Sequence, residues 1–229
     1  MQHDTLMGIA LGAPHEATGL VLLERIEELG PWNKARKLYD VIPKYRVAGV
    51  HRVPRSEGYG STARAAQELW PTLELRKHAT EKSRDIIVAN VSKAGRAALE
   101  PMRDLGLHPV PVDVTGIVGG KPDKRSYQIG APELTAASVV VQEEKRITMA
   151  PDVDARELAE QLRAARLKAD GVELADALAL ALWWSEMKWR ARLAQPRPPR
   201  QALAEAIEKA CRPPTFNQVL EMAKKRRAA

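Results

Sequence analysis

The sequence predicts an α/β fold in which helices flank a mixed sheet, and three patterns indicate it. Two apolar runs, 6–11 and 18–24, are separated by a short Gly/Pro loop and predict an antiparallel hairpin. Two strand-like runs, 85–90 and 108–114, enclose a helical pattern, and a strand-helix-strand unit implies parallel pairing. A long Ala/Leu-rich helix, 174–193, follows and can cover such a sheet.

The first half of the chain contains the hairpin and a third strand. Residues 12–17 form the loop between the first two strands, and residues 46–53 alternate partly, as a third strand does. Residues 27–44 have a mixed composition that predicts no single element. Gly58-Tyr-Gly-Ser61 breaks the chain, and Ser61 or Thr62 is expected to cap a helix that reaches about Leu69.

The run 85–90 is the clearest strand, because a continuous apolar stretch is typical of a central strand covered on both faces. Ser92 is expected to cap the next helix, which Gly106 ends. Prolines in 108–114 favour an edge position or the start of a strand.

The second half is mostly helical. A loop over 115–128 precedes a helix (131–144) and a short strand (146–149), and Asp152 or Asp154 is expected to cap a helix reaching about Leu167. Prolines at 196, 198 and 199 form a linker before weaker helices at 201–211 and 217–227. We therefore expect one domain, 1–194, and a proline-linked basic helical tail, 195–229.

Composition narrows the class of protein. Of 229 residues, 45% are apolar, which is enough for a sizeable core. The single cysteine, Cys211, rules out a disulfide within the chain and argues against a cysteine-based zinc site. No apolar run approaches the roughly 20 residues that span a bilayer. These features predict a protein of the (host) cytoplasm without a membrane partner.

The net charge of +7 is unevenly distributed. Residues 185–229 contain 11 basic and 4 acidic residues, so the whole excess of positive charge lies there. Such a segment suits a polyanion such as nucleic acid, although a solubilising tail is equally compatible with it.

Five segments share the order and spacing of one known domain. They are MGIALGAPHEATGL (7–20), IIVANVSKAGR (86–96), LHPVPVDVTG (107–116), IGAPEL (129–134) with KRITMA (145–150), and VELADALALA (172–181) before Trp183. Together they resemble the RNase H-like nuclease domain of tailed-phage terminase large subunits, over about residues 6–189. The resemblance implies a mixed RNase H-like sheet flanked by helices.

The resemblance also implies a site with two Mg²⁺ or Mn²⁺ ions, held by carboxylates at two strand ends and on a late helix. Here Ala10 and Asn90 stand at the two strand-end positions, and Val172 and Glu173 replace the acidic pair of the last motif. An alanine cannot ligate a metal ion, and an asparagine adds no charge to offset one. The metal ions of the family are therefore uncertain cofactors of this chain.

The remaining candidates for catalysis are Glu173, Asp176 and Glu16, and Glu173 with Asp176 are the candidate metal ligands. Acids at a helix start also favour the helix dipole, so Glu173 and Asp176 have a purely structural interpretation. For Glu16 the favoured interpretation is a solvated loop residue. We expect Asn90 to satisfy backbone groups at a strand end.

Two groups of basic residues are candidates for contacts to double-stranded DNA, because lysine and arginine neutralise phosphates. One lies in the loop that the resemblance places near the DNA backbone, although an ordinary exposed turn explains these loop residues equally well. The other lies in the tail. Together they are Lys121, Lys124, Arg125, Arg197, Arg200, Lys224, Lys225, Arg226 and Arg227. Trp183 is expected in the core. Trp184 or Trp189 either packs this helix against the tail, which is the favoured interpretation, or is left for a protein partner.

Three functions remain open. The leading hypothesis is a stand-alone homologue of the terminase nuclease, since no Walker-type motif occurs, with cleavage impaired or lost. It would bind DNA, or packaging or capsid proteins, in phage DNA packaging or virion assembly. The second is a metal-dependent endonuclease with a relocated acidic set that includes Asp113. The third is an interaction protein that binds no nucleic acid.

Overall fold

The computed structural model describes residues 3–34, 38–54, 56–70, 85–115, 127–151, 153–154, 156–166 and 171–194. Within them, seven strands form one sheet: β1 (His3–Ala10), β2 (Thr18–Asn33), β3 (Leu38–Val53), β4 (Ile86–Asn90), β5 (Val110–Thr115), β6 (Tyr127–Gly130) and β7 (Ile147–Met149). The helices there are α1 (Tyr59–Leu69), the 3-10 helix η2 (Arg96–Leu99), α2 (Glu100–Asp104), α3 (Ala131–Glu143), α4 (Arg156–Arg166) and α5 (Glu173–Ala194).

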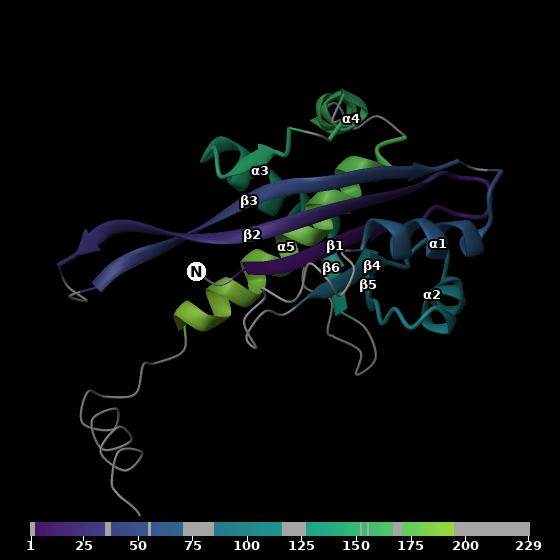
Figure 1. Cartoon of the computed structure of the whole chain (residues 1–229), viewed down its shortest axis with the longest axis horizontal. Helices are drawn as coiled ribbons and strands as arrows, with labels where there is room; N and C mark the ends of the chain where they lie inside the picture. The colour runs from purple at the N-terminus through teal and green to yellow at the C-terminus, as the bar shows by residue number, and fades with distance from the viewer. Residues whose placement is uncertain are drawn as a thin grey trace, which may run out of the picture. The chain divides into compact units, whose positions relative to one another are not determined.

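The sheet is mixed, as the sequence predicts. Its strand order is β6-β5-β4-β1-β2-β3-β7 (Figure 1). β1, β2 and β3 pair antiparallel, whereas β4, β5 and β6 extend the sheet from β1 in parallel. β7 joins the opposite edge in parallel with β3. The antiparallel hairpin and the parallel strand-helix-strand unit are therefore both confirmed.

The prolines of 108–114 mark the start of β5, one of the two predicted positions, and not an edge of the sheet. β6, in a segment expected to be part of a loop, pairs with β5 from Val112 to Thr115. The proline in this strand, Pro111, stands opposite Ala89 of β4 and precedes the first residue that pairs with β6. A proline lacks only its own N–H, so the strand still pairs on both sides.

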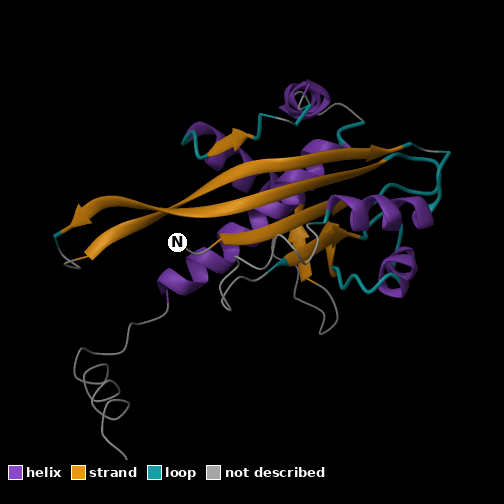
Figure 2. Cartoon of the chain, in the orientation of Figure 1, coloured by secondary structure: helices purple, strands orange, loops and turns teal. Residues whose placement is uncertain are grey.

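Each face of the sheet has its own helical layer. Alternate residues of a strand point to opposite faces. Leu6 and Ala10 accordingly pack with α3, α4 and α5, and Met7 and Ile9 pack with α1, η2 and α2. Figure 2 shows the helices on either side of the strands. The apolar run of β4 is continuous because both faces of the strand are covered: Val88 packs on the side of α5, and Ile87 packs on the side of α1.

Two predicted helix starts are wrong. α1 begins at Tyr59 after Gly58, so neither Ser61 nor Thr62 caps it, and Thr62 is buried. The helix expected after Ser92 is a turn followed by η2 and the short α2, although Gly106 ends it with a positive φ of 78°, as predicted. Asp154 does cap α4, because its Oδ1 accepts the Arg156 N–H at 3.1 Å.

The β2–β3 hairpin is much longer than the sheet beside it. β1 pairs with β2 only as far as Ile26, and β7 pairs with β3 only at residues 45–47. Residues 27–33 and 38–44 thus form a two-stranded ribbon that projects from the sheet at the left of Figure 1. A β-bulge lies between Leu29 and Trp32. The bulge shifts the alternation of side chains, which is why this stretch predicts no strand from its pattern.

The tryptophans at residues 183 and 184 are both core residues. Trp183 is buried as expected, and its Nε1 donates to Glu133 at 3.3 Å. Trp184 is buried too, with its ring edge-on to Tyr127 of β6 at 4.9 Å between centroids. The prediction that Trp184 could face a partner is therefore wrong, and the side chain of Trp189 lies outside the described residues.

The sheet and its covering helices belong to a unit that ends at Lys188, within α5. The predicted boundary at residue 194 and the helical tail lie at the limit of, or outside, the described residues, so both stay predictions. Among the helices described, none is long and apolar enough to cross a membrane.

Candidate functional site

The candidate site lies where β1 and β4 end. Ala10 and Asn90 are the last residues of these two strands and are direct partners in the parallel register. Both belong to the side-chain set that faces α5, since Leu6 and Val88, their counterparts two or four residues earlier, pack in the core beneath that helix. The two strand-end positions singled out in the sequence therefore stand side by side.

The side chain of Asn90 is bound within its own loop. Its Oδ1 accepts the backbone N–H of Ser92 at 3.0 Å and the Ser92 hydroxyl at 2.7 Å. The same hydroxyl oxygen accepts the N–H of Val114 on β5 at 2.6 Å. The prediction that Asn90 satisfies backbone groups is confirmed. Ser92 joins the ends of β4 and β5, rather than capping a helix.

Two glycines let α5 approach the strands and bring its first turn to this corner. A Cβ on Gly8 would lie 1.9 Å from the carbonyl oxygen of Ala177, and one on Gly19 would lie 2.4 Å from that of Glu173. Only glycine permits such backbone contact. The start of α5, with Glu173 and Asp176, is therefore fixed over the carboxyl end of β1 and the start of β2.

Glu173 lies in this first turn between protein neighbours. Its Oε2 lies 3.6 Å from Nε of Arg52 on β3, and Arg52 also pairs with Glu157 of α4 at 3.1 Å. The Oε2 atom is buried and makes no hydrogen bond within the described part of the chain. Glu173 is thus held by a loose ion pair with Arg52, and its Oε2 atom accepts no hydrogen bond in the described residues.

Asp176 is exposed, and its backbone N–H donates to Val172 in the first turn of the helix. Partial loss of water around its carboxylate raises the pKa of Asp176, Lys93 acts to lower it, and Glu173 raises it further. The raised pKa means that the negative charge of Asp176 is not fully compensated by its neighbours.

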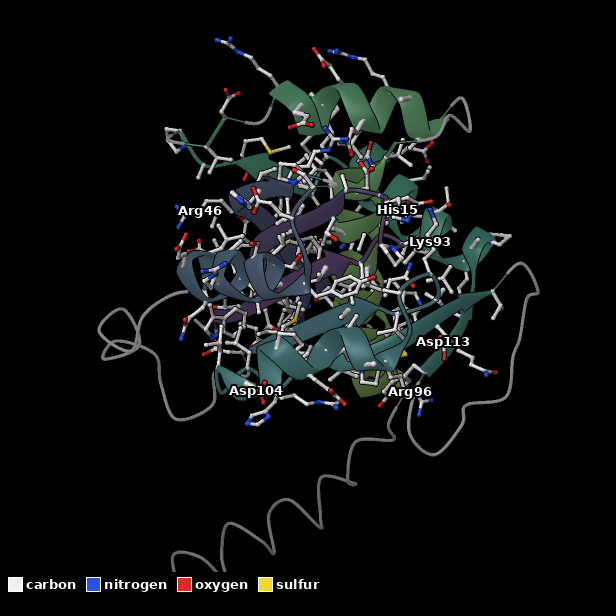
Figure 3. The ribbon with its side chains drawn as sticks, turned by 90° about the vertical axis from the view of Figure 1, so that its right-hand side faces the viewer. His15, Arg46, Lys93, Arg96, Asp104 and Asp113 are labelled. Atoms are coloured by element: carbon white, nitrogen blue, oxygen red, sulfur yellow. The ribbon has the colours of Figure 1, made fainter. Side chains whose placement is uncertain are left out.

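Glu16 and Lys93 close the corner from two loops. Nζ of Lys93, in the loop after β4, lies 2.7 Å from Oε2 of Glu16, in the loop between β1 and β2. Figure 3 looks onto this face and labels Lys93 together with His15, the neighbour of Glu16. The bond to Glu16 raises the pKa of Lys93 against partial burial, and the charges of Asp176 and Glu173 add to the rise. Three carboxylates therefore act on one ammonium group.

These residues do not fit a two-metal site. Ala10 offers no ligand, the Asn90 oxygen accepts two hydrogen bonds, and a lysine already binds Glu16. Within the part of the chain that the structure describes, no group of three or more His, Cys, Asp or Glu side chains could hold a metal ion. Divalent ions of this class need several oxygen ligands with negative charge. No reaction step through a metal ion follows from this geometry.

Other predicted residues lie apart from this corner or beyond the described residues. Asp113 follows Val112, which packs under α5, so its side chain points to the opposite face of the sheet from Asp176. The relocated acidic set therefore loses Asp113. All nine candidate DNA-binding residues, from Lys121 to Arg227, lie outside the described residues.

Lys93 and Arg52 were not among the site residues predicted from the sequence. Lys93 had a usable signal, because it lies three residues after the carboxyl end of a central strand, where open α/β sheets place their sites. Arg52 had none, since its partners Glu157 and Glu173 are more than 100 residues away in the sequence.

Comparison with known proteins finds similar solved structures but no similar sequence. No family model and no curated protein sequence matches the chain. The manganese-soaked terminase nuclease domain of human cytomegalovirus superposes with a TM-score of 0.50 at 12% identity, over 80% of this chain and 83% of that one. The chain has the fold of a terminase nuclease domain, so the RNase H-like fold predicted from the five segments is confirmed.

Two further structures of terminase nucleases superpose over a similar length. The large terminase nuclease of the thermophilic phage G20c covers 78% of this chain and 81% of its own, with a TM-score of 0.44 and 14% identity. The inhibitor-bound form of the cytomegalovirus domain covers 79% of this chain and 83% of its own, with a TM-score of 0.48 and 14% identity. At such low identity, function has to be argued from the side chains of the corner.

Proposed function

We propose that this chain is a terminase-nuclease relative that binds double-stranded DNA without hydrolysing it, as a DNA- or protein-binding factor in phage DNA packaging or virion assembly. The observation that carries the proposal is the pair of strand ends. Ala10 and Asn90 are adjacent, face the start of α5 and bring no carboxylate to it. Hydrolysis of a phosphodiester by two metal ions needs anionic ligands at this position.

Binding of DNA is supported by charge. The excess of basic residues lies in 185–229, and Lys121, Lys124 and Arg125 add a second basic group. Such groups bind phosphates without reading sequence, and the affinity falls as salt rises. The cytomegalovirus domain that shares this fold is a terminase nuclease, which supports a role in packaging.

The absence of cleavage is tested with supercoiled plasmid, the full chain and Mn²⁺ or Mg²⁺. We expect no nicked product above that of a Glu173→Ala, Asp176→Ala double variant. Nicking by the natural chain that disappears in the double variant would overturn the proposal and establish a metal-dependent endonuclease with a relocated acidic site.

DNA binding is tested by fluorescence anisotropy with a 30-base-pair duplex at several salt concentrations. Replacing the run Lys224, Lys225, Arg226 and Arg227 by glutamine in the full chain should lower the slope of log K against log salt by about one unit for each phosphate that is no longer neutralised. Glutamine at Arg103 and Arg163, basic residues of α2 and α4, is the matched control. Binding that does not depend on salt would contradict the proposal.

A second candidate function, protein binding without DNA, is favoured by the β2–β3 ribbon. Leu29, Trp32 and Tyr39 are 77%, 50% and 55% exposed on it, and the two rings stack edge-on at 5.1 Å. Exposed tryptophan and tyrosine are frequent at the centres of protein interfaces. A partner complex that a Trp32→Ser, Tyr39→Ser variant loses, together with an absence of DNA binding by the natural chain, would establish this function in place of the first.

A further inference from the structure

Two of the three carboxylates of the corner have protein cations beside them: Glu16 bonds to Lys93, and Glu173 lies beside Arg52. The third, Asp176, is only partly compensated. Each of these acids was a candidate ligand for a divalent ion. Their negative charge is balanced, in part, by groups that belong to the chain itself.

The loops fix where these cations lie. Lys93 follows the turn that Ser92 ties to both Asn90 and Val114, so its backbone is anchored to two strand ends. Arg52 is held in the β2–β3 ladder opposite Gly19, the residue on which the start of α5 rests. Both cations therefore stand on anchored backbone on either side of the first turn of α5.

An ammonium or guanidinium group cannot replace the chemistry of a metal ion. It offers no open coordination position and does not activate water as a divalent ion does. It does compete for the same carboxylate oxygens, because each oxygen that accepts a hydrogen bond from Lys93 loses that electron pair as a metal ligand. The cations thus weaken metal binding further, in addition to the loss of the two carboxylate ligands at Ala10 and Asn90.

We propose that Lys93 and Arg52 are resident cations that pair with Glu16 and Glu173 and keep divalent ions out of this corner. The inference deepens the proposed function, which requires a corner without catalytic metal, and names the residues that exclude the ion. It makes the corner a site whose charge is balanced in part by the chain itself, whereas a metal-dependent nuclease leaves that balance to an exchangeable ion.

The test compares the full chain with Lys93→Met and with the Lys93→Met, Arg52→Met double variant, with and without MnCl2. Methionine keeps an unbranched apolar stem and removes the charge. The natural chain should show no change of Tm with Mn²⁺, whereas the double variant should gain about 3 °C or more, since an ion that binds only the folded chain raises its stability. Titration calorimetry with MnCl2 should show one site in the double variant only.

Three further variants separate this result from general effects. Lys93→Arg keeps the charge and should behave as the natural chain. Lys44→Met removes a surface lysine paired with Glu28 at 3.6 Å, and it should not gain a response to Mn²⁺. Adding Asp176→Asn to the double variant should abolish the gained response.

Two results would overturn the inference. One is a Mn²⁺ response of the natural chain that Asp176→Asn removes, because the ion would then bind despite the cations. The other is a folded double variant, verified by circular dichroism, that responds to Mn²⁺ no more than Lys44→Met does. Plasmid nicking measured on the same samples keeps the two proposals apart, since a natural chain that binds Mn²⁺ but nicks no DNA refutes only the role of the cations.

Discussion

The first turn of α5 and the stretch around Ser185 and Glu186 both carry acids toward the sheet, but the two regions are held in different ways. At the first turn, backbone contacts at Gly8 and Gly19 fix the helix, and Glu173 and Asp176 keep loose or exposed surroundings. Later in the helix, Glu186 is buried and bonded, with its Oε1 accepting from the Tyr45 hydroxyl at 2.7 Å and from Arg146 at 2.6 Å.

The difference separates charges that hold the fold from charges that remain available. The Glu186 network joins α5 to β3 and to the residue before β7, and Glu186 itself is buried. The first turn retains an oxygen of Glu173 without a hydrogen bond in the described residues and a carboxylate of Asp176 with a raised pKa. Incompletely compensated groups of this kind are typical of functional sites.

The largest effect is expected from Glu186→Ala. Removing Glu186 takes away the buried partner of Arg146 and leaves it only the exposed Glu144 at its Nε, so the free energy of unfolding should fall by about 3 kcal/mol. Urea unfolding followed by circular dichroism measures it. A Glu173→Ala variant, as control at the other region, should lose less than half as much. Equal decreases in the free energy of unfolding for the two variants would contradict the proposed difference between the two regions.

A smaller loss is expected from Gly8→Ala, which pushes α5 away from β1. The new Cβ overlaps the Ala177 carbonyl oxygen at 1.9 Å, and overpacking of this kind costs about 1–3 kcal/mol. Gly60→Ala in α1 is the matched control, because no atom lies within 4 Å of its Cβ and alanine favours a helix. The two Tm values, measured together, should move in opposite directions; a Gly8→Ala protein as stable as the natural one would disprove the close contact.

Tyr45→Phe should destabilise by about 1 kcal/mol, the usual net value of one hydrogen bond, since Glu186 keeps Arg146 as partner. Burial and then Glu186 raise the pKa of the Tyr45 hydroxyl, so it stays protonated and donates throughout the stable pH range. Chemical unfolding at pH 7 and pH 9 should give the same difference between variant and natural chain. A difference that vanishes at pH 9 would show that the hydroxyl ionises.

The smallest effect concerns pH and Asp176. Its pKa is raised in the folded chain, so the folded state binds more protons than the unfolded state above the ordinary pKa of about 4. Its contribution to stability is complete below that pH and is lost as pH rises through the folded pKa. Asp176→Asn should therefore become more stable relative to the natural chain from pH 4 to pH 7, by less than about 1 kcal/mol because the side chain is exposed. Thermal unfolding across this range measures it, and the opposite trend would contradict the raised pKa.

The frame of this protein follows from its amino-acid sequence alone. The runs of β1 and β4, the glycine after α2 and the Ala/Leu pattern of α5 follow from local periodicity and chain breakers, which act within a few residues. The five ordered segments were sufficient to predict the RNase H-like fold and to place Ala10, Asn90 and Glu173 at its strand ends and late helix.

The surroundings of those positions depend on the folded chain. The pairing of β6 beside β5, the burial of Trp184 against Tyr127 and the approach of Lys93 and Arg52 to the acids all join residues far apart in the sequence. Such contacts depend on backbone approach at Gly8 and Gly19 and on the ends of neighbouring strands, and no local pattern encodes them. The sequence therefore indicated which ligands were missing, and the fold determined which cations stand beside the acids that remain.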